Sequence, residues 1–221
     1  MITETKNKGS ILDPENYNAY LTARLKGDKR TCGEIVRELL SKEVPVNDLY
    51  EQLFRNSLYE VGKLWETNQI SVAVEHLATS ITENMMTLVY PTIFSADKIG
   101  KKAIITCTPH EFHQIGARMV ADVFELSGWD GYYLGANTPE NDLFEMIKDK
   151  KPDVLGVSVS IYFNIKTMME LVDKVRVHYP DLHILLGGQA FQHGGHEIVQ
   201  KLSNSTYIES LDQLKARIGE G

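Results

Sequence analysis

The sequence of 221 residues is poor in cysteine, in long apolar runs and in excess basic charge. Its two cysteines, Cys32 and Cys107, are too few for a disulfide framework, and a cytoplasmic location is expected. The chain has no run of about 18 apolar residues, so we expect no membrane span. Its polar first ten residues lack the apolar segment of a secretory signal. Formal net charge is −7, from 23 basic and 30 acidic side chains, which argues against direct binding to nucleic acid.

The first part of the chain repeats apolar residues at helical spacing. This pattern predicts helices over about residues 14–26, 29–42, 46–68 and 71–91. Four helices joined by short loops favour an antiparallel bundle. We therefore expect a flexible tail at residues 1–12 and a four-helix bundle at residues 13–98.

After Gly100 short apolar runs alternate with amphipathic stretches, a pattern typical of a buried parallel sheet. The predicted strands are residues 103–107, 132–134, 154–159, 184–186 and 206–208. The predicted helices are residues 114–127, 140–150, 166–178, 196–202 and 211–218. The expected fold is thus α + α/β, with a flavodoxin- or Rossmann-like five-stranded sheet over residues 99–221. Ligands of such sheets bind beyond the carboxyl ends of the strands.

The loop after the first predicted strand has residue types suited to a metal or cofactor site. Glu111 lies two positions before His113, so its carboxylate can orient the imidazole and raise its basicity. Gly116 would allow close approach of a ligand where the next helix begins. The alternative is a polar loop that caps a helix.

Two later loops carry small residues. Ser158 and Ser160 end the third predicted strand, where hydroxyl groups can bind a ligand or cap the strand. Gly187 and Gly188 end the fourth, where they can let a ligand lie against the backbone or form an ordinary turn. The sequence contains no GxGxxG or phosphate-loop motif, which argues against a nucleotide site.

Together, the motifs Glu-x-His-x-x-Gly, Ser-x-Ser and Gly-Gly resemble the cobalamin-binding domain of methionine synthase and its relatives. That family usually has Asp-x-His-x-x-Gly, so Glu111 stands where an aspartate is common. The resemblance implies cobalamin as cofactor and His113 as the lower cobalt ligand, in place of dimethylbenzimidazole. It also implies that the displaced nucleotide tail lies beside Ser158 and over Gly187 and Gly188.

A second signature lies in the helical part, where Trp65 is followed, after nine residues, by Glu75 and His76. On their own these residues read as a core aromatic and a solvated helix start. The spacing, however, resembles the helical cap of light-responsive, adenosylcobalamin-binding transcriptional regulators. That resemblance implies that Trp65 packs on the 5′-deoxyadenosyl group and that Glu75 and His76 contact it.

Two departures from those regulators shape the expected function. Glu66 replaces a histidine that can ligate cobalt in them, and no basic helix-turn-helix segment precedes the bundle. We therefore expect a light-dependent regulator rather than an enzyme, one that signals through a partner protein or a change in homo-oligomer. The main alternative is a corrinoid methyl carrier of a methyltransferase system, loaded with methylcobalamin. A mutase subunit and a module that stores cobalamin or binds another tetrapyrrole are further alternatives.

Overall fold

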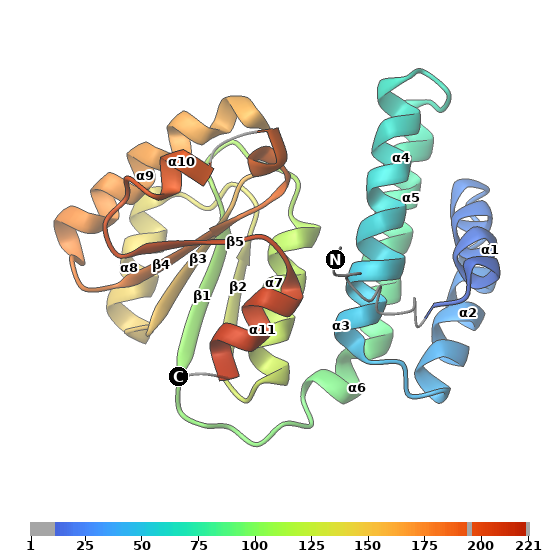
Figure 1. Cartoon of the computed structure of the whole chain (residues 1–221), viewed down its shortest axis with the longest axis horizontal. Helices are drawn as coiled ribbons and strands as arrows, with labels where there is room; N and C mark the ends of the chain where they lie inside the picture. Colours follow the sequence, from blue (N-terminus) through green and yellow to red (C-terminus); the bar gives the residue numbers. More distant parts are fainter. Residues whose placement is uncertain (1–11, 194–195, 220–221) are drawn as a thin grey trace, which may run out of the picture. The chain divides into compact units, whose positions relative to one another are not determined.

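A computed structural model describes residues 12–193 and 196–219 (Figure 1). The chain divides between Pro91 and Thr92 into a helical unit and a unit built on a parallel sheet. Residues 94–101, which include the predicted boundary at residue 98, form neither helix nor strand. Of the predicted tail at residues 1–12, only Leu12 lies within the described residues, and its side chain is buried.

The helical unit follows the predicted order. Its elements are α1 (Pro14–Leu25), α2 (Lys29–Ser41), α3 (Val46–Asp48), η1 (Leu49–Arg55), α4 (Asn56–Glu66), α5 (Val72–Met86), η2 (Thr87–Val89) and α6 (Tyr90–Ile93). The side chain of Ser71 caps α5 by accepting the N–H of Val74. Tyr20 and Tyr50 pack against Phe54 in the core, with ring centroids 5.9 and 5.8 Å away.

The helix predicted over residues 46–68 differs from the expectation in two ways. Its η1 segment is π-helical and coincides with four fully buried side chains: Leu49, Tyr50, Leu53 and Phe54. The helix also ends at Glu66, because Asn68 adopts a left-handed conformation (φ +57°) and the N–H of Gln69 turns back to the Leu64 carbonyl, 2.8 Å away. Trp65 therefore lies at the end of α4.

The second unit confirms the predicted five-stranded parallel sheet, in the order β2-β1-β3-β4-β5. The strands are β1 (Lys102–Cys107), β2 (Asp130–Gly135), β3 (Val154–Ser158), β4 (His183–Gly187) and β5 (Ser205–Ile208). The other elements are α7 (Ile115–Leu126), α8 (Glu140–Lys150), η3 (Tyr162–Asn164), α9 (Ile165–His178), η4 (Gln189–His193), α10 (His196–Val199) and α11 (Leu211–Gly219). Figure 1 shows α7 and α11 on one side of the sheet and α8 and α9 on the other.

One hydrophobic core of this unit lies between the sheet and the helices α8 and α9. Ile104, Leu155 and Leu186 from three strands pack there with Leu143 of α8 and Val172 of α9, all buried. The helix predicted over residues 196–202 is shorter than expected. It ends at Val199, after which the N–H groups of Lys201 and Leu202 donate to carbonyls three residues back and form turns.

Candidate functional site

The strand register brings the three predicted motifs to one edge of the sheet. Cys107 pairs with Ser158, and Ser158 pairs with Gly187. The loops after β1, β3 and β4 therefore begin side by side at the carboxyl ends of the strands. Further bonds tie them together, since the N–H of Thr108 donates to the Ser158 carbonyl and the N–H of Val159 to the Gly187 carbonyl, both at 2.9 Å.

Glu111 is the centre of this edge. Its side chain is fully buried, and its Oε2 atom accepts the backbone N–H groups of Ser160 and Ile161, both at 2.9 Å. The same oxygen accepts Nδ2 of Asn164 at 3.2 Å. All three of these donors to Oε2 come from the segment that follows β3, whereas Glu111 itself lies in the loop after β1.

The other oxygen of Glu111 holds His113. Oε1 accepts the backbone N–H of His113 at 3.1 Å and lies 2.5 Å from Nδ1 of its ring. Because an ionised carboxylate only accepts, Nδ1 carries the proton, and Nε2 is the nitrogen with which this imidazole can ligate a metal. The His113 side chain is 63% exposed. The contact between Glu111 and His113 therefore forms despite the glutamate in place of aspartate.

The environment keeps Glu111 ionised. Burial opposes its charge, but the hydrogen bonds from His113, Ile161 and Ser160 prevail and lower the pKa of Glu111 to about 2. Burial, followed by the charge of Glu111, raises the pKa of the nearby Cys107 thiol to about 12. Cys107 is thus a neutral core thiol at neutral pH rather than a nucleophile.

The three predicted glycines differ in what surrounds them. A Cβ added to Gly116, in the first turn of α7, would meet no described atom within 4 Å, so the space beside the His113 loop is open. Gly188 has φ +118°, and a Cβ there would lie 2.2 Å from the Val159 carbonyl oxygen. A Cβ on Gly187 would lie 3.0 Å from the Ile208 carbonyl oxygen. The protein's own packing therefore requires glycine at position 188.

The structure also brings in residues that the motifs did not include. Asn164 and the Ile161 N–H hold Glu111, as described above, and Thr108 lies where the His113 loop begins. The Thr108 hydroxyl is buried and has no hydrogen-bond partner within residues 12–193 and 196–219. An orphaned hydroxyl and the open space at Gly116 fit a bound group at this edge. Asn164 directly precedes α9, and no sequence motif pointed to its contact with Glu111.

In the helical unit, the predicted residues lie near the junction of α4 and α5. The side chain of His76 is 75% exposed, whereas that of Glu75 is 25% exposed. Trp65 is 47% exposed, which argues against a core role. Gly62, one turn before it, leaves open space on its Cβ side. Glu75 lies 2.5 Å from Nδ1 of His76, and its other oxygen accepts the hydroxyl of Thr79 at 2.8 Å. These contacts are all local to α5.

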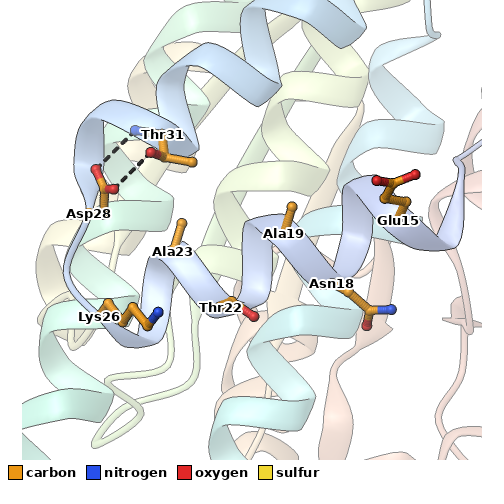
Figure 2. A pocket seen from close by; sticks show the side chains of 8 residues that line it. All are labelled: Glu15, Asn18, Ala19, Thr22, Ala23, Lys26, Asp28 and Thr31. Atoms are coloured by element: carbon orange, nitrogen blue, oxygen red, sulfur yellow. Dashed lines mark hydrogen bonds between the residues drawn. The ribbon is translucent and has the colours of Figure 1, made fainter.

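A shallow groove in the helical unit contains none of the predicted site residues. Figure 2 shows that it is lined by α1 and the start of α2. There Asp28 caps α2 by accepting the backbone N–H and the hydroxyl of Thr31. Among the described residues, no three His, Cys, Asp or Glu side chains converge as a metal site. A metal held by a macrocycle needs one protein ligand, which His113 offers. No helix in the described part of the chain is long and apolar enough to cross a membrane.

Fold and geometry together define a class of protein, in which a helical unit accompanies a flavodoxin-like sheet with a carboxylate-bound histidine at its carboxyl edge. A family model described as a B12 binding domain matches residues 101–208, and a second model with the same description matches residues 17–90. The two matches together support a cobalamin-binding family for this chain.

Relatives of several kinds resemble the chain, among them transcriptional repressors and corrinoid proteins. The HTH-type transcriptional repressor CarH of Myxococcus xanthus is 23% identical over 77% of this chain, which spans 56% of the length of CarH. Trimethylamine corrinoid protein 1 of Methanosarcina acetivorans is 20% identical over 67% of this chain and 70% of its own length. The solved structure of the Methanosarcina barkeri monomethylamine corrinoid protein matches with a TM-score of 0.80 at 17% identity, over 94% of this chain and 99% of that one. This structural likeness confirms the fold.

Proposed function

We propose that the protein is a cobalamin-binding regulator that uses adenosylcobalamin as a light-sensitive chromophore. The observation that carries this proposal is the exposed Trp65 with Glu75 and His76 in the cap of a chain that has a B12-binding domain. The same spacing is found in light-responsive regulators, and CarH is among the relatives. Its output would pass through a partner protein or a change in homo-oligomer.

In the second unit, His113 would be the lower ligand of cobalt, through Nε2. The open space at Gly116, the orphaned Thr108 hydroxyl and the hydroxyls of Ser158 and Ser160 would face the rest of the cofactor. Gly187 and Gly188 would shape the edge along which the nucleotide tail lies.

In the cap, Trp65 would pack on the adenosyl group, and Glu75 and His76 would contact it. Adenosylcobalamin, when bound, supplies a cobalt–carbon bond that visible light breaks. An aromatic contact of this kind contributes on the order of 1–3 kcal/mol, by analogy with base stacking. Its loss is sufficient to shift a two-state equilibrium whose states differ by a few kcal/mol.

A corrinoid methyl carrier is the second candidate. The observation in its favour is the match to the monomethylamine corrinoid protein over nearly the full length of both chains. In that case the protein would hold methylcobalamin, would not itself be an enzyme, and would have a methyltransferase as its partner.

The test is reconstitution of the full chain in the dark with adenosylcobalamin and, separately, with methylcobalamin. Absorption spectra and molecular size are recorded before and after green light. Tighter binding of adenosylcobalamin, with a spectrum and a size that change on illumination, supports the regulator. Preference for methylcobalamin, with methyl transfer to a thiol acceptor, would establish the carrier instead.

A further inference from the structure

Arg24 of α1 places a positive charge inside the helical unit. Its side chain is fully buried, and its Nη1 atom donates to the Ser57 hydroxyl at 2.6 Å. Its Nε and Nη2 atoms have no hydrogen-bond partner among the residues that the structure describes. These two atoms form the edge with which a guanidinium group binds a carboxylate side-on. The free edge leaves a buried charge without a bound acid, which is costly.

Glu75 supplies the negative charge that acts on this guanidinium at neutral pH. Burial lowers the pKa of Arg24, and the charges of four side chains oppose that shift: Tyr20, Cys32, Tyr17 and Glu75. Burial also raises the pKa of both tyrosines and raises that of the Cys32 thiol to about 11. These three groups are therefore neutral at pH 7, where a carboxylate is charged. Glu75 is thus the anion of this set.

The face of α5 that carries Glu75 lies next to α1. Glu75 precedes the fully buried Ala78 by three positions and Thr82 by seven, a spacing that places the three residues on one face of a helix. Helix α1 packs against α5, and both Thr82 and Arg24 act on the hydroxyl of Tyr20. Glu75 is partly buried at the start of this face, so packing and charge both connect it to Arg24.

We propose that Arg24 is a positioning residue for Glu75, whose carboxylate it attracts from inside the helical unit. This inference rests on the proposed contact of Glu75 with the adenosyl group. The two oxygens of Glu75 are bound by His76 and Thr79, as described above. The attraction to Arg24 holds the carboxylate against α5 in the conformation that makes both contacts. The buried cation therefore acts on the cofactor through Glu75.

A double-mutant cycle on the apo protein tests this pair without any cofactor. Arg24→Met removes the buried positive charge, and Glu75→Gln removes the negative charge. With Arg24 present, Glu75→Gln leaves the cation without its anion, so the unfolding equilibrium constant should rise about tenfold. In the Arg24→Met background, Glu75→Gln should raise it by less than about twofold. Equal effects of Glu75→Gln in the two backgrounds would overturn the proposal.

Glu34→Gln is the matched control, because it removes an exposed carboxylate of α2 that pairs with Arg30. Its effect should be small and the same in both backgrounds. If Arg24→Met does not fold, Arg24→Gln replaces it. If neither folds, a Glu75→Gln protein as stable as the wild type refutes the proposal. A Glu75→Gln protein destabilised beside an unaffected Glu34→Gln protein supports it.

The second readout separates positioning from a structural role. Arg24→Met should lower the affinity for adenosylcobalamin about fivefold and leave the affinity for methylcobalamin unchanged. Arg24→Lys keeps the charge and should restore the affinity, whereas Arg24→Met added to Glu75→Gln should cause no further loss. An equal loss for both cobalamins would make Arg24 purely structural and overturn the proposal. If the wild type does not prefer adenosylcobalamin, the proposed role of Glu75 fails, while the cycle on the apo protein still decides whether Arg24 holds Glu75.

Discussion

The two sets of predicted cofactor residues are built in different ways. In the sheet unit, Glu111 is fully buried and joins loops about 50 residues apart, so His113 is held before any ligand arrives. In the helical unit, Trp65 is half exposed, and Glu75 bonds only to its neighbours His76 and Thr79 among the contacts described above. The first set is tied together by hydrogen bonds between loops. In the second set the hydrogen bonds of Glu75 stay within α5, although its charge also acts on the buried Arg24 of α1.

The comparisons assign both units to cobalamin binding, since one B12 binding domain model matches residues 101–208 and a second matches residues 17–90. The network around His113 lies within the first of these matches. A helix surface can change without disturbing the fold, and transcriptional repressors and corrinoid proteins both appear among the relatives. We infer that the sheet unit defines the cofactor and that the cap surface defines its use.

The largest expected effect comes from His113→Ala. It removes the expected cobalt ligand, so the histidine-ligated absorption spectrum should disappear entirely. His178→Ala is the matched control. His178 is an exposed residue at the end of α9, and its ring stacks on that of Phe144 in α8. A histidine-ligated spectrum that survives in His113→Ala would break the assignment of the lower site.

Acid should weaken the sheet unit through Glu111. Its pKa of about 2 in the folded protein lies below its ordinary value of 4.5, so the ionised form stabilises the fold. That contribution, about 3 kcal/mol, is present above pH 4.5 and is lost as the pH falls toward 2. Urea unfolding from pH 6 to pH 2 measures it. Glu111→Gln should be less stable at pH 6 and should show a shallower pH dependence; identical pH profiles would contradict the prediction.

Trp65→Ala should change cofactor preference while leaving the sheet site intact. We expect adenosylcobalamin affinity to fall by about 1–3 kcal/mol, or roughly 5- to 150-fold, with methylcobalamin affinity nearly unchanged. Titration calorimetry in the dark measures both. Val177→Ala removes another exposed apolar side chain, from α9, and serves as control. An equal loss for both cobalamins would assign Trp65 to corrin binding in general.

Gly116→Ala should have the smallest effect. The added methyl group would enter open space, so the unfolding free energy of the apo protein should change by less than about 1 kcal/mol. Cobalamin affinity should nevertheless fall, by up to roughly tenfold, if the cofactor occupies that space. Unaltered affinity would place the cofactor away from the start of α7.

Sequence patterns predicted the sheet well because buried parallel strands are short apolar runs between turns. The same reasoning missed the π-helical turns at Leu49–Arg55, which coincide with two pairs of adjacent, fully buried apolar residues. It also predicted too long a helix after residue 196. The spacing of apolar residues continues beyond Val199, but the backbone there forms turns instead of further helix.

The sequence also predicted which motif residues meet at the sheet edge. It did not predict the residues that hydrogen-bond to them or pack against them. Asn164 contacts Glu111 across 53 residues, and no local pattern encodes such a contact. Gly188 was predicted either to let a ligand lie against the backbone or to form an ordinary turn. Its conformation and its approach to Val159 show that the chain itself requires glycine there, and the ligand contact stays a prediction. Spacing identifies which residues share an edge, and only packing shows which atoms meet there.

The most direct test of the whole account is green-light illumination of the full chain loaded with adenosylcobalamin in the dark, for the wild type and Trp65→Ala side by side. The account predicts a histidine-ligated spectrum in both before illumination. It predicts a light-induced change in molecular size for the wild type that is reduced in Trp65→Ala. A wild-type protein that binds adenosylcobalamin through His113, loses the adenosyl group in light and changes neither its size nor its binding to other proteins would contradict the assignment of the cap as the regulatory surface.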